Sequence, residues 1–288
     1  MKKLILGTRG SKLAVAQSTW VAETITAMTG SVVELKIITT KGDLILDKPL
    51  AEIGGKGLFT HELEQALLNR TIDFAVHSCK DLPTENPPGL HIACYPKRED
   101  PRDALIGGPL DDNVIVGTGS ARRQAQLGLL SAVTFKGIRG NVDTRIRKME
   151  NGDYERVVLA MAGLNRVGIK RNDVVPLSIE ECVPAPAQGA LALQVNSERV
   201  EVIEILEKIQ CMETKIAVEA ERNFLHEIGG GCHAALGAYV KSISNEPNDK
   251  YEMFVFFKEG SQVFKFHEET FEPMKLSSLL AQTIQNGK

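Results

Sequence analysis

The sequence predicts an α/β protein with two similar α/β domains and a small α+β domain after them. Strand-like apolar runs alternate with helix-like segments through most of the chain. The pattern of residues 4–11 returns at 114–120: an apolar strand, a Gly-Thr turn, a serine cap and a helix. After residue 234, three strand-like runs precede one helix. Each repeat would aim the N–H groups of a helix N-terminus at a shared cleft, which favours anions.

The first domain is expected to hold strands at 2–8, 32–39, 74–76 and 90–95 and helices at 11–29 and 59–69. Ser11 is the expected N-cap of the first helix and Gly30 its end. The buried face of this helix is expected to contain Leu13, Ala16, Trp20 and Ile25. Residues 41–58 read as a polar, glycine-rich connection.

The remaining elements follow in order along the chain. We expect strands at 114–116, 132–135, 157–161, 191–195, 235–241, 251–257 and 262–267, and helices at 142–150, up to Arg166, 198–209, 212–228 and 276–285. The charged residues 97–103 and the Pro/Gly-rich residues 183–189 read as the crossings between domains. The expected domains are 1–96 with 188–210, then 97–187, then 211–288.

The bulk composition is that of an ordinary soluble protein, with 43% hydrophobic and 25% charged residues among 288. The basic and apolar residues 1–7 are too few for a signal-peptide core, and no stretch reaches the length of a membrane span. The five cysteines are an odd number and include no Cys-x-x-Cys pair. We therefore expect a reducing, cytoplasmic setting without a disulfide framework, a metal site or a membrane partner.

The net charge of −3 is unevenly spread. Residues 118–171 hold 11 Lys and Arg against 4 Asp and Glu, a local excess of +7 inside an acidic protein. Such an excess indicates an anionic ligand, with nucleic acid as the rival interpretation. Aromatic residues make up only 5%, and no zinc-finger, RNA-recognition or helix-turn-helix signature is present, so we expect no nucleic acid as partner.

Residues 73–83 place a lysine beside a carboxylate at the end of a predicted strand. The apolar run 74–76 forms the strand, and Pro83 ends regular structure. Lys80 and Asp81 therefore lie at the carboxyl end of the strand, where ligands bind in open α/β sheets. A Lys-Asp pair is also common on any solvated turn, so this stretch alone leaves both interpretations open.

Several arginines stand at predicted helix starts. Arg9 precedes the first helix, and Arg122 and Arg123 occupy the first turn of its counterpart, where a cation opposes the helix dipole. Arg139 and Arg145 flank the start of the next helix. Such a local conflict is typical of functional sites, and the planar guanidinium suits carboxylate or phosphate. One arginine of this kind is usually a solvated residue; the group together indicates an anion site.

Two glycine-rich segments carry one reactive residue each. Lys56 lies in a run that resembles a phosphate loop, but glycine follows it rather than Ser or Thr, which favours a mobile cationic loop or a plain surface turn over ATP binding. Cys232 follows three glycines and is either a small buried thiol or an accessible nucleophile. Its neighbour His233 is poorly placed to act as its base, which argues against a cysteine hydrolase.

Taken together, these residues resemble the hydroxymethylbilane synthase (porphobilinogen deaminase) family. The resemblance implies two periplasmic-binding-protein-like (type II) α/β domains with mixed sheets, plus a small C-terminal α+β domain. The matching motifs keep the family's order from residue 4 to about 240 and are Thr8–Ser11, Gly42–Asp43, Gly54–Phe59, Ala75–Pro83, Arg98–Asp103, Gly117–Gln124, Arg139–Arg145, Ala162–Arg166, Gln188–Gly189 and Gly230–Cys232.

The resemblance also implies a monomeric transferase of tetrapyrrole (haem and porphyrin) biosynthesis. It joins four porphobilinogens head to tail, with loss of ammonia, into linear hydroxymethylbilane on a dipyrromethane cofactor held by a thioether to Cys232. Asp81 matches the catalytic carboxylate, and Lys56 lies on the family's mobile loop. Positions that match those holding cofactor or substrate carboxylates are Arg9, Ser11, Lys80, Thr118, Ser120, Arg122, Arg123, Arg139, Arg145, Arg166 and Gln188.

This chemistry accounts for the residue types. Each porphobilinogen brings two carboxylates, so a growing polyacid needs many arginines. Loss of ammonia leaves a cation that one carboxylate can stabilise while it moves protons. Two other classes stay open on the residues: an organic-anion solute-binding protein with the same two domains, and a nucleic-acid binder.

The sequence departs from the family pattern at a few positions. Cys79 replaces the usual methionine, Gly229 stands where Glu often precedes Gly-Gly-Cys, and His233 begins a segment that differs after the cysteine. Gly119 replaces a common serine, and the third domain ends early. None of these departures removes a residue with an implied role.

Overall fold

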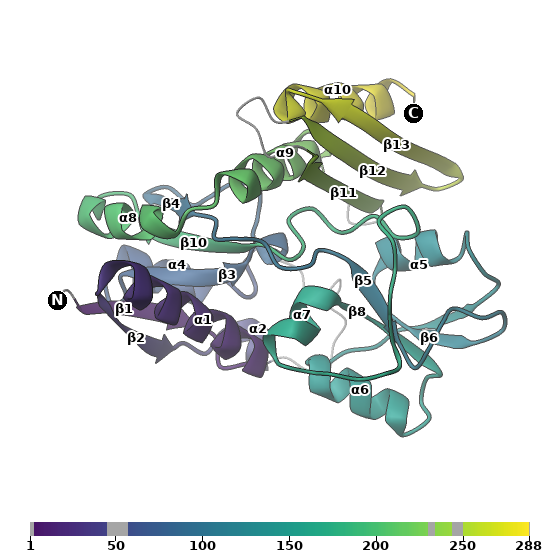
Figure 1. The fold of residues 1–288 in the computed structure, drawn as a ribbon, viewed down its shortest axis with the longest axis horizontal. Coiled ribbons are helices and arrows are strands. Elements are labelled where there is room, and N and C mark those ends of the chain that lie inside the picture. Colours follow the sequence, from purple (N-terminus) through teal and green to yellow (C-terminus); the bar gives the residue numbers. More distant parts are fainter. Residues whose placement is uncertain (1–2, 45–56, 230–233, 244–249, 288) are drawn as a thin grey trace. The chain divides into compact units, whose positions relative to one another are not determined.

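A computed structural model describes residues 3–44, 57–229, 234–243 and 250–287 (Figure 1). By its contacts the chain divides into two compact units. The first unit contains residues 1–98 and 190–215, and the second contains residues 99–189 and 216–288. The three-domain boundaries expected from the sequence stay a prediction.

The first unit is built on a five-stranded mixed sheet in the order β2-β1-β3-β10-β4. Strand β1 runs parallel to β2 and β3, whereas β10 runs antiparallel to β3 and β4. The elements are β1 (Lys3–Thr8), α1 (Lys12–Thr29), β2 (Val32–Ile37), α2 (Lys41–Leu44), α4 (His61–Leu68), β3 (Phe74–Ser78), η1 (Cys79–Asp81), β4 (Leu90–Cys94), β10 (Leu191–Asn196), α8 (Val200–Leu206) and η2 (Glu207–Ile209).

Both faces of this sheet are covered, which explains why its central strands are apolar without alternation. In β3, Phe74 and Val76 pack with the helices α1 and α8. Ala75 packs on the opposite face with Leu63 and Leu67 of α4. Alternate residues of β3 therefore pack on opposite faces of the sheet, and the residues after β3 lie at the carboxyl end of the strand.

The second unit contains a sheet with the same plan. Its order is β7-β6-β8-β5-β9, in which β6 runs parallel to β7 and β8, and β5 runs antiparallel to β8 and β9. Its elements are β5 (Asp103–Ile106), β6 (Ile115–Gly117), α5 (Ala121–Leu127), β7 (Thr134–Lys136), α6 (Val142–Glu150), β8 (Arg156–Ala160), α7 (Met161–Arg166) and β9 (Val174–Pro176).

The two sheets correspond strand for strand, with β1 matching β6 and the antiparallel strand fourth in each order. The repeated sequence pattern is thus confirmed as a repeated structure: Ser11 caps α1 and Ser120 caps α5 after equivalent strands. The predicted fold class is confirmed in its plan of elements: two α/β parts with five-stranded mixed sheets and a small part with an antiparallel sheet and helices.

A three-stranded antiparallel sheet completes the second unit, in the order β11-β12-β13. One face packs on two helices through residues such as Val255 and Phe257. The other face packs through Phe254 and Phe256 against Val183 and residues near it. The elements are α9 (Met212–Ile228), β11 (Ala235–Ser242), β12 (Tyr251–Glu259), β13 (Gln262–Thr270) and α10 (Pro273–Asn286).

Two points of the sequence analysis need correction. Strands β5 and β9 were not expected, because β5 begins inside a charged segment and the edge strand β9 contains a proline, which edge positions tolerate. In α1, the side chain of Trp20 is 40% exposed, and the buried residues include Gln17 and Val21 instead. No helix in the described part of the chain is long and apolar enough to cross a bilayer.

Candidate active site

Lys80 and Asp81 lie where the sequence predicted, just after the carboxyl end of β3. The one-turn helix η1 holds them, and the fully buried Cys79 fixes this turn because its N–H donates to the Ala190 carbonyl at 3.0 Å. The side chains of Lys80 and Asp81 are exposed. The buried Gln17 of α1 donates to the Ser78 hydroxyl at 3.0 Å, which ties the end of β3 to the neighbouring helix.

Arg9 and Ser11 lie at the same edge of the sheet, because β1 runs parallel to β3 and ends beside it. Ser11 caps α1 by accepting from the Ala14 N–H at 3.3 Å. The Arg9 guanidinium donates to the Asp43 carboxylate at 2.5 and 3.2 Å and lies 4.1 Å from the centre of the Phe59 ring. Arg9 therefore already has a carboxylate partner in this structure.

The Asp43 carboxylate accepts hydrogen bonds from two residues, Arg9 and Thr40. Besides Arg9, the Thr40 hydroxyl donates to Asp43 Oδ2 at 2.7 Å. Burial by itself would raise the pKa of the Asp43 carboxyl, but these donors and the Arg9 charge lower it below its ordinary value. Both oxygens of the Asp43 carboxylate are thus already engaged in hydrogen bonds.

His77, in β3, is a buried polar residue that the sequence did not single out. Burial lowers the pKa of the imidazole to about 4, and the nearby charge of Arg9 adds to this against a raising effect of Gln194. Within the described residues, His77 Nε2 and Gln194 Oε1 have no hydrogen-bond partner. The ring is therefore neutral at physiological pH; it lies within the matched motif Ala75–Pro83, although no role was expected for it.

Thr118 and Ser120 lie after β6, the counterpart of β1. Ser120 accepts from the Arg123 N–H at 3.4 Å and donates its own N–H to the Thr118 hydroxyl at 3.2 Å. Thr118 is buried, and its N–H donates to the Lys136 carbonyl at the end of β7. Both residues therefore shape the start of α5.

Arg122 and Arg123 are buried, and both reach the carboxylate of Asp103. Arg122 donates to Asp103 Oδ2 at 2.7 Å and to the Val183 carbonyl at 2.7 Å. Arg123 donates to Asp103 Oδ1 from Nη2 at 2.5 Å and from Nε at 3.1 Å, and to the Val158 carbonyl at 2.9 Å. The cost of placing cations in the first turn of α5 is offset by this carboxylate.

Gln188 and Arg166 fix the segment that follows. Gln188 donates to Asp103 Oδ1 at 2.9 Å and to the Pro101 carbonyl at 2.8 Å. Arg166, at the end of α7, donates to the Gly189 carbonyl at 2.7 Å. Burial lowers the pKa of Arg166 to about 10, and Glu99 opposes this.

The turn before Gln188 depends on a second buried carboxylate. Glu221 is fully buried and accepts from the Ala187 N–H at 2.6 Å and from the Val240 N–H at 2.8 Å. Ala187 has a φ of 62°, the left-handed region that residues with a Cβ seldom adopt. The hydrogen bond that the Ala187 N–H donates to Glu221 stabilises this conformation and thereby helps to direct Gln188 toward Asp103.

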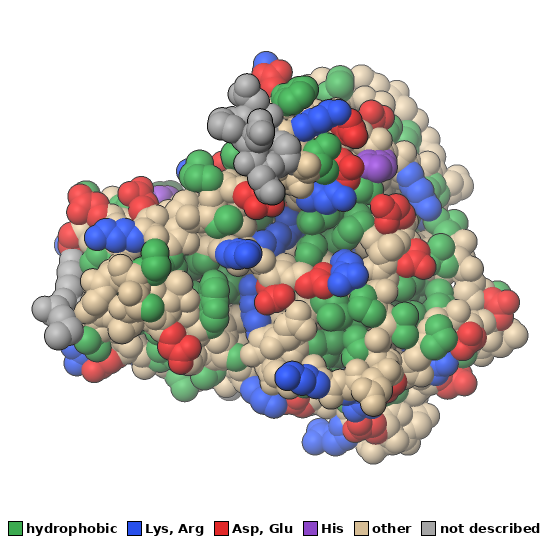
Figure 2. Space-filling model, in the orientation of Figure 1, with side chains coloured by type: hydrophobic (Ala, Val, Ile, Leu, Met, Phe, Trp, Pro, Cys, Tyr) green, Lys and Arg blue, Asp and Glu red, His purple; other side chains and the backbone are tan. Residues whose placement is uncertain are grey.

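Arg139 and Arg145 have different surroundings from Arg122. Arg145 donates to the Gly140 carbonyl at 2.7 Å, and burial, together with the charges of Arg123 and Arg139, lowers its pKa. Nη1 of Arg139 is buried and has no hydrogen-bond partner among the described residues. Figure 2 shows Lys and Arg side chains, with Asp and Glu side chains among them, over α6, the helix that carries Arg145. Like charges held close together with a donor to spare are what an anion site requires.

Two predicted residues cannot be placed. Lys56 and Cys232 lie outside the described residues. The residues that sequence reasoning missed are Asp103 and Glu221, both fully buried carboxylates. Asp103 lies in a motif that was noted, but its burial could be seen only once β5 was known.

Two of the departures from the family pattern have a physical account. Cys79 fills a fully buried position, where a small thiol packs as an apolar group. Gly229 follows α9 with a φ of 71°, so a residue with a Cβ at this position would be strained.

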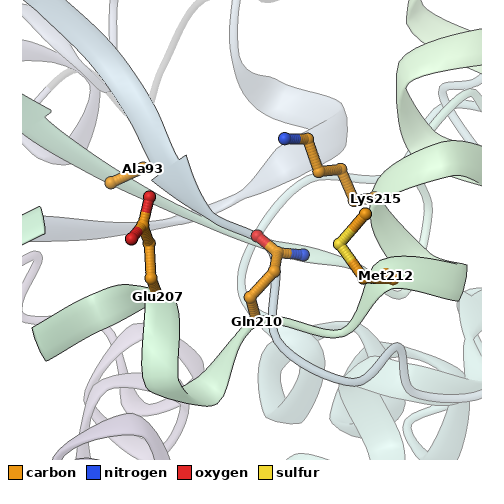
Figure 3. A pocket seen from close by; sticks show the side chains of 5 residues that line it. All are labelled: Ala93, Glu207, Gln210, Met212 and Lys215. Carbon is orange, nitrogen blue, oxygen red and sulfur yellow. The ribbon is translucent and has the colours of Figure 1, made fainter. Parts of the chain in front are cut away.

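The pocket in Figure 3 contains none of the predicted site residues. It has a volume of about 350 Å³ and is lined by Ala93, Glu207, Gln210, Met212 and Lys215. The Gln210 amide is occupied with the Tyr95 backbone, from whose N–H it accepts at 3.1 Å and to whose carbonyl it donates at 3.0 Å. Throughout residues 3–44, 57–229, 234–243 and 250–287, no group of three His, Cys, Asp or Glu could hold a metal ion.

Comparison with known proteins gives one family. The family model for "Porphobilinogen deaminase, dipyromethane cofactor binding domain" matches residues 4–204. The chain is 40% identical over 292 residues to a porphobilinogen deaminase of Brevibacillus brevis, covering 99% of this chain and 94% of that protein. It is 45% identical over 258 residues to one of Bacillus thuringiensis, covering 85% and 82%.

Solved structures with a similar arrangement are more distant. They include a substrate-binding protein of an amino acid ABC transporter, with a TM-score of 0.36 and 13% identity, covering 79% of this chain and 94% of that one. Substrate-binding domain 2 of Lactococcus lactis GlnP has a TM-score of 0.42 and 10% identity, with 80% and 91% covered. At these scores they carry no conclusion about function.

Proposed function

The chain belongs to the porphobilinogen deaminase family, and from this premise we propose that it joins four porphobilinogens head to tail into linear hydroxymethylbilane, with release of ammonia. The structural observation that best supports this proposal concerns two neighbouring arginines, Arg139 and Arg145. Their charges lie close enough to lower a pKa, and one buried donor has no partner among the described residues. A substrate with two carboxylates per pyrrole would meet both requirements.

The residues present fit the dipyrromethane cofactor of the family. A dipyrrole with carboxylate side chains needs cationic donors, and the buried Nη1 of Arg139 is one. When bound, the cofactor supplies the end onto which pyrroles are added. We propose that Cys232 holds the cofactor through a thioether. The residues proposed to bind the carboxylates of the cofactor and of the substrate are Arg9, Ser11, Lys56, Lys80, Thr118, Ser120, Arg122, Arg123, Arg139, Arg145, Arg166 and Gln188.

Asp81 is the proposed catalytic carboxylate. Its side chain is exposed at the carboxyl end of β3, and η1 holds it beside Lys80. A carboxylate there can accept from a pyrrole N–H of the substrate, oppose the positive charge left when ammonia departs, and hold the proton that is lost. Asp43 is less suited, because its oxygens are taken by Arg9 and Thr40.

We also propose that the protein acts as a monomer in the cytoplasm, in keeping with its five scattered cysteines. A solute-binding protein with two such α/β domains is the alternative. The relatives of this chain are named porphobilinogen deaminases, which favours the enzyme over the solute-binding protein. Reversible binding of porphobilinogen without ammonia release would favour the alternative.

Intact-protein mass tests the proposal. We expect the purified protein to be heavier than its chain by one covalent dipyrrole, and the Cys232→Ser variant to lack this addition because an alcohol is a poorer nucleophile than a thiolate. Cys211→Ser is the matched control, since Cys211 is partly exposed and should leave the addition in place. A wild-type mass equal to that of the bare chain would refute the proposal.

The role of Asp81 is tested by single-turnover ammonia release in cofactor-loaded protein. Asp81→Asn keeps the size but not the charge, and we expect a loss of about two to three orders of magnitude in rate. Asp81→Glu should keep measurable activity, because misplacing a group costs less than losing it. Glu85→Gln, an exposed carboxylate nearby in the chain, is the control. A wild-type rate for Asp81→Asn would make Asp81 a structural residue.

A further inference from the structure

Asp103 is the most heavily engaged carboxylate of the second unit. It begins β5, its side chain is fully buried, and it pairs through backbone hydrogen bonds of β5 with β8. Its two oxygens accept from different arginines: Oδ1 from Arg123 and Oδ2 from Arg122. Neither the family comparison nor the sequence assigns a role to this residue.

Two uncharged side chains complete the shell around Asp103. Gln188 donates to Oδ1 at 2.9 Å, and the Cys182 thiol lies 3.5 Å from Oδ2 and from Nη1 of Arg122. Burial, in the presence of Asp103, raises the pKa of Cys182 to about 12, against the effect of the arginines, so the thiol stays protonated and can donate. Every contact therefore fixes the carboxylate in one orientation, and the carboxylate fixes both guanidinium groups.

The charges of this cluster do not balance. One carboxylate faces two guanidinium groups, and the charge of Arg123 also acts on Arg145. A buried pair that served only stability needs no second cation, since well-packed apolar residues stabilise as well or better. The charge of Arg139, whose Nη1 has no partner among the described residues, also acts on Arg145, so Arg123, Arg139 and Arg145 form one group of neighbouring cations.

We propose that Asp103 is a positioning residue for the reaction. It holds the Arg122 and Arg123 side chains in fixed directions before any ligand binds, and so prepares the anion site that they form with Arg139 and Arg145. The inference rests on the proposed function, because it assigns these arginines to carboxylates of the cofactor and substrate. Asp103 itself touches no ligand and acts through the arginines.

The first experiment uses Asp103→Asn, which keeps the shape and removes the charge. We expect kcat per cofactor-loaded chain to fall by about tenfold or more, because the two guanidinium groups lose their orientation, while KM changes by less than about threefold because no ligand contact is removed. The control is Asp173→Asn, which breaks the bidentate Asp173–Arg171 pair elsewhere in the same unit. It should keep the wild-type kcat.

A double-variant cycle shows through which residue Asp103 acts. Arg122→Met is combined with Asp103→Asn, and the losses in kcat are compared. If Asp103 acts through the arginines, the double variant should lose at least about fivefold less than the product of the two single losses. The thermal midpoint is the readout independent of activity: the double variant, which loses one charge of each sign, should melt above Asp103→Asn, which leaves both arginines buried without their carboxylate.

A folding failure does not end the test. If Asp103→Asn gives no folded protein, Cys182→Ala replaces it in the cycle; its loss in kcat should be about two- to fivefold in the wild-type background and absent beside Arg122→Met. Equal effects of Cys182→Ala in both backgrounds overturn the inference.

Two results from the main experiment also overturn it: a wild-type kcat in folded, loaded Asp103→Asn, and single losses that multiply in full. The proposed function is judged separately, on the wild type and Asp173→Asn, both of which must carry the adduct and release ammonia.

Discussion

Two groups of arginines lie in the second unit, and they differ in what their guanidinium groups contact. Arg122 and Arg123 are buried against Asp103 and backbone carbonyls. Arg139 and Arg145 lie near other cations, and Nη1 of Arg139 has no partner within the described residues. All four lie near the start of a helix, so the sequence pattern alone predicted the same role, binding an anion, for all of them.

The difference shows that cations at helix starts differ in their partners inside the protein: a buried carboxylate compensates Arg122 and Arg123, whereas Nη1 of Arg139 has no such partner among the described residues. For Arg122, burial would lower its pKa, but Asp103 raises it above its ordinary value. For Arg145, burial and two neighbouring cations act in the same direction and lower it. The fold thus stabilises the charged form of Arg122, whereas the charged form of Arg145 would gain stability from a bound anion.

The largest expected effect is on stability in the first group. Arg122→Met should lower the free energy of unfolding by about 3 kcal/mol, because it breaks a buried ion pair and leaves the Val183 carbonyl without this donor. Urea denaturation measures it.

The control for this prediction is Arg147→Met, an exposed residue of α6. It should change the free energy of unfolding by less than about 0.5 kcal/mol. Equal effects of Arg122→Met and Arg147→Met would show that burial against Asp103 contributes nothing to stability, and the comparison would fail.

The second group should respond in the opposite way. Arg139→Leu and Arg145→Leu should leave the free energy of unfolding within about 0.5 kcal/mol of wild type or raise it, because the first removes a like charge that acts on Arg145 and the second removes the Arg145 charge itself. Binding should weaken by about 1.5–3 kcal/mol for each charged hydrogen bond lost, or about 10- to 150-fold. Urea denaturation and titration with porphobilinogen measure the two quantities.

If both leucine variants lost stability as Arg122→Met does and kept wild-type affinity, the two groups would have exchanged roles. Wild-type affinity alone, with unchanged stability, would remove these arginines from the anion site.

The smallest effect is expected at Arg9, whose surroundings are intermediate in kind: it has a carboxylate partner, as Arg122 has, but is only partly buried. The Arg9–Asp43 pair lowers the pKa of Asp43 below its ordinary 3.8. A depressed carboxyl pKa contributes stability that is present above pH 3.8 and is lost as the pH falls through the folded value. This part should amount to about 1 kcal/mol or less.

The measurement is urea denaturation of wild type and Asp43→Asn between pH 6 and pH 3. The difference in stability between them should shrink as the pH falls below 3.8. A constant difference over this range would mean that the charge of Asp43 contributes nothing to folding.

Much of the architecture could be predicted because it depends on local patterns. The helices at 142–150 and 212–228 have the bounds that were expected, and Gly30 ends α1 in the left-handed conformation with a φ of 70°. The repeated strand, Gly-Thr turn and serine cap is a local pattern as well, and it predicted two sheets of one plan. Such features arise from residues that are close in the chain.

The sequence by itself determined the family resemblance, the residue types of the site and the place of Asp81 after a strand. Only the tertiary structure decided which arginines are already paired. Asp103 lies in the short strand β5, and it meets Arg122, Arg123 and Gln188 because β5 lies beside β8 and near the start of α5. The partner of a buried charge is set by packing between segments far apart in the chain, and no local pattern encodes that pairing.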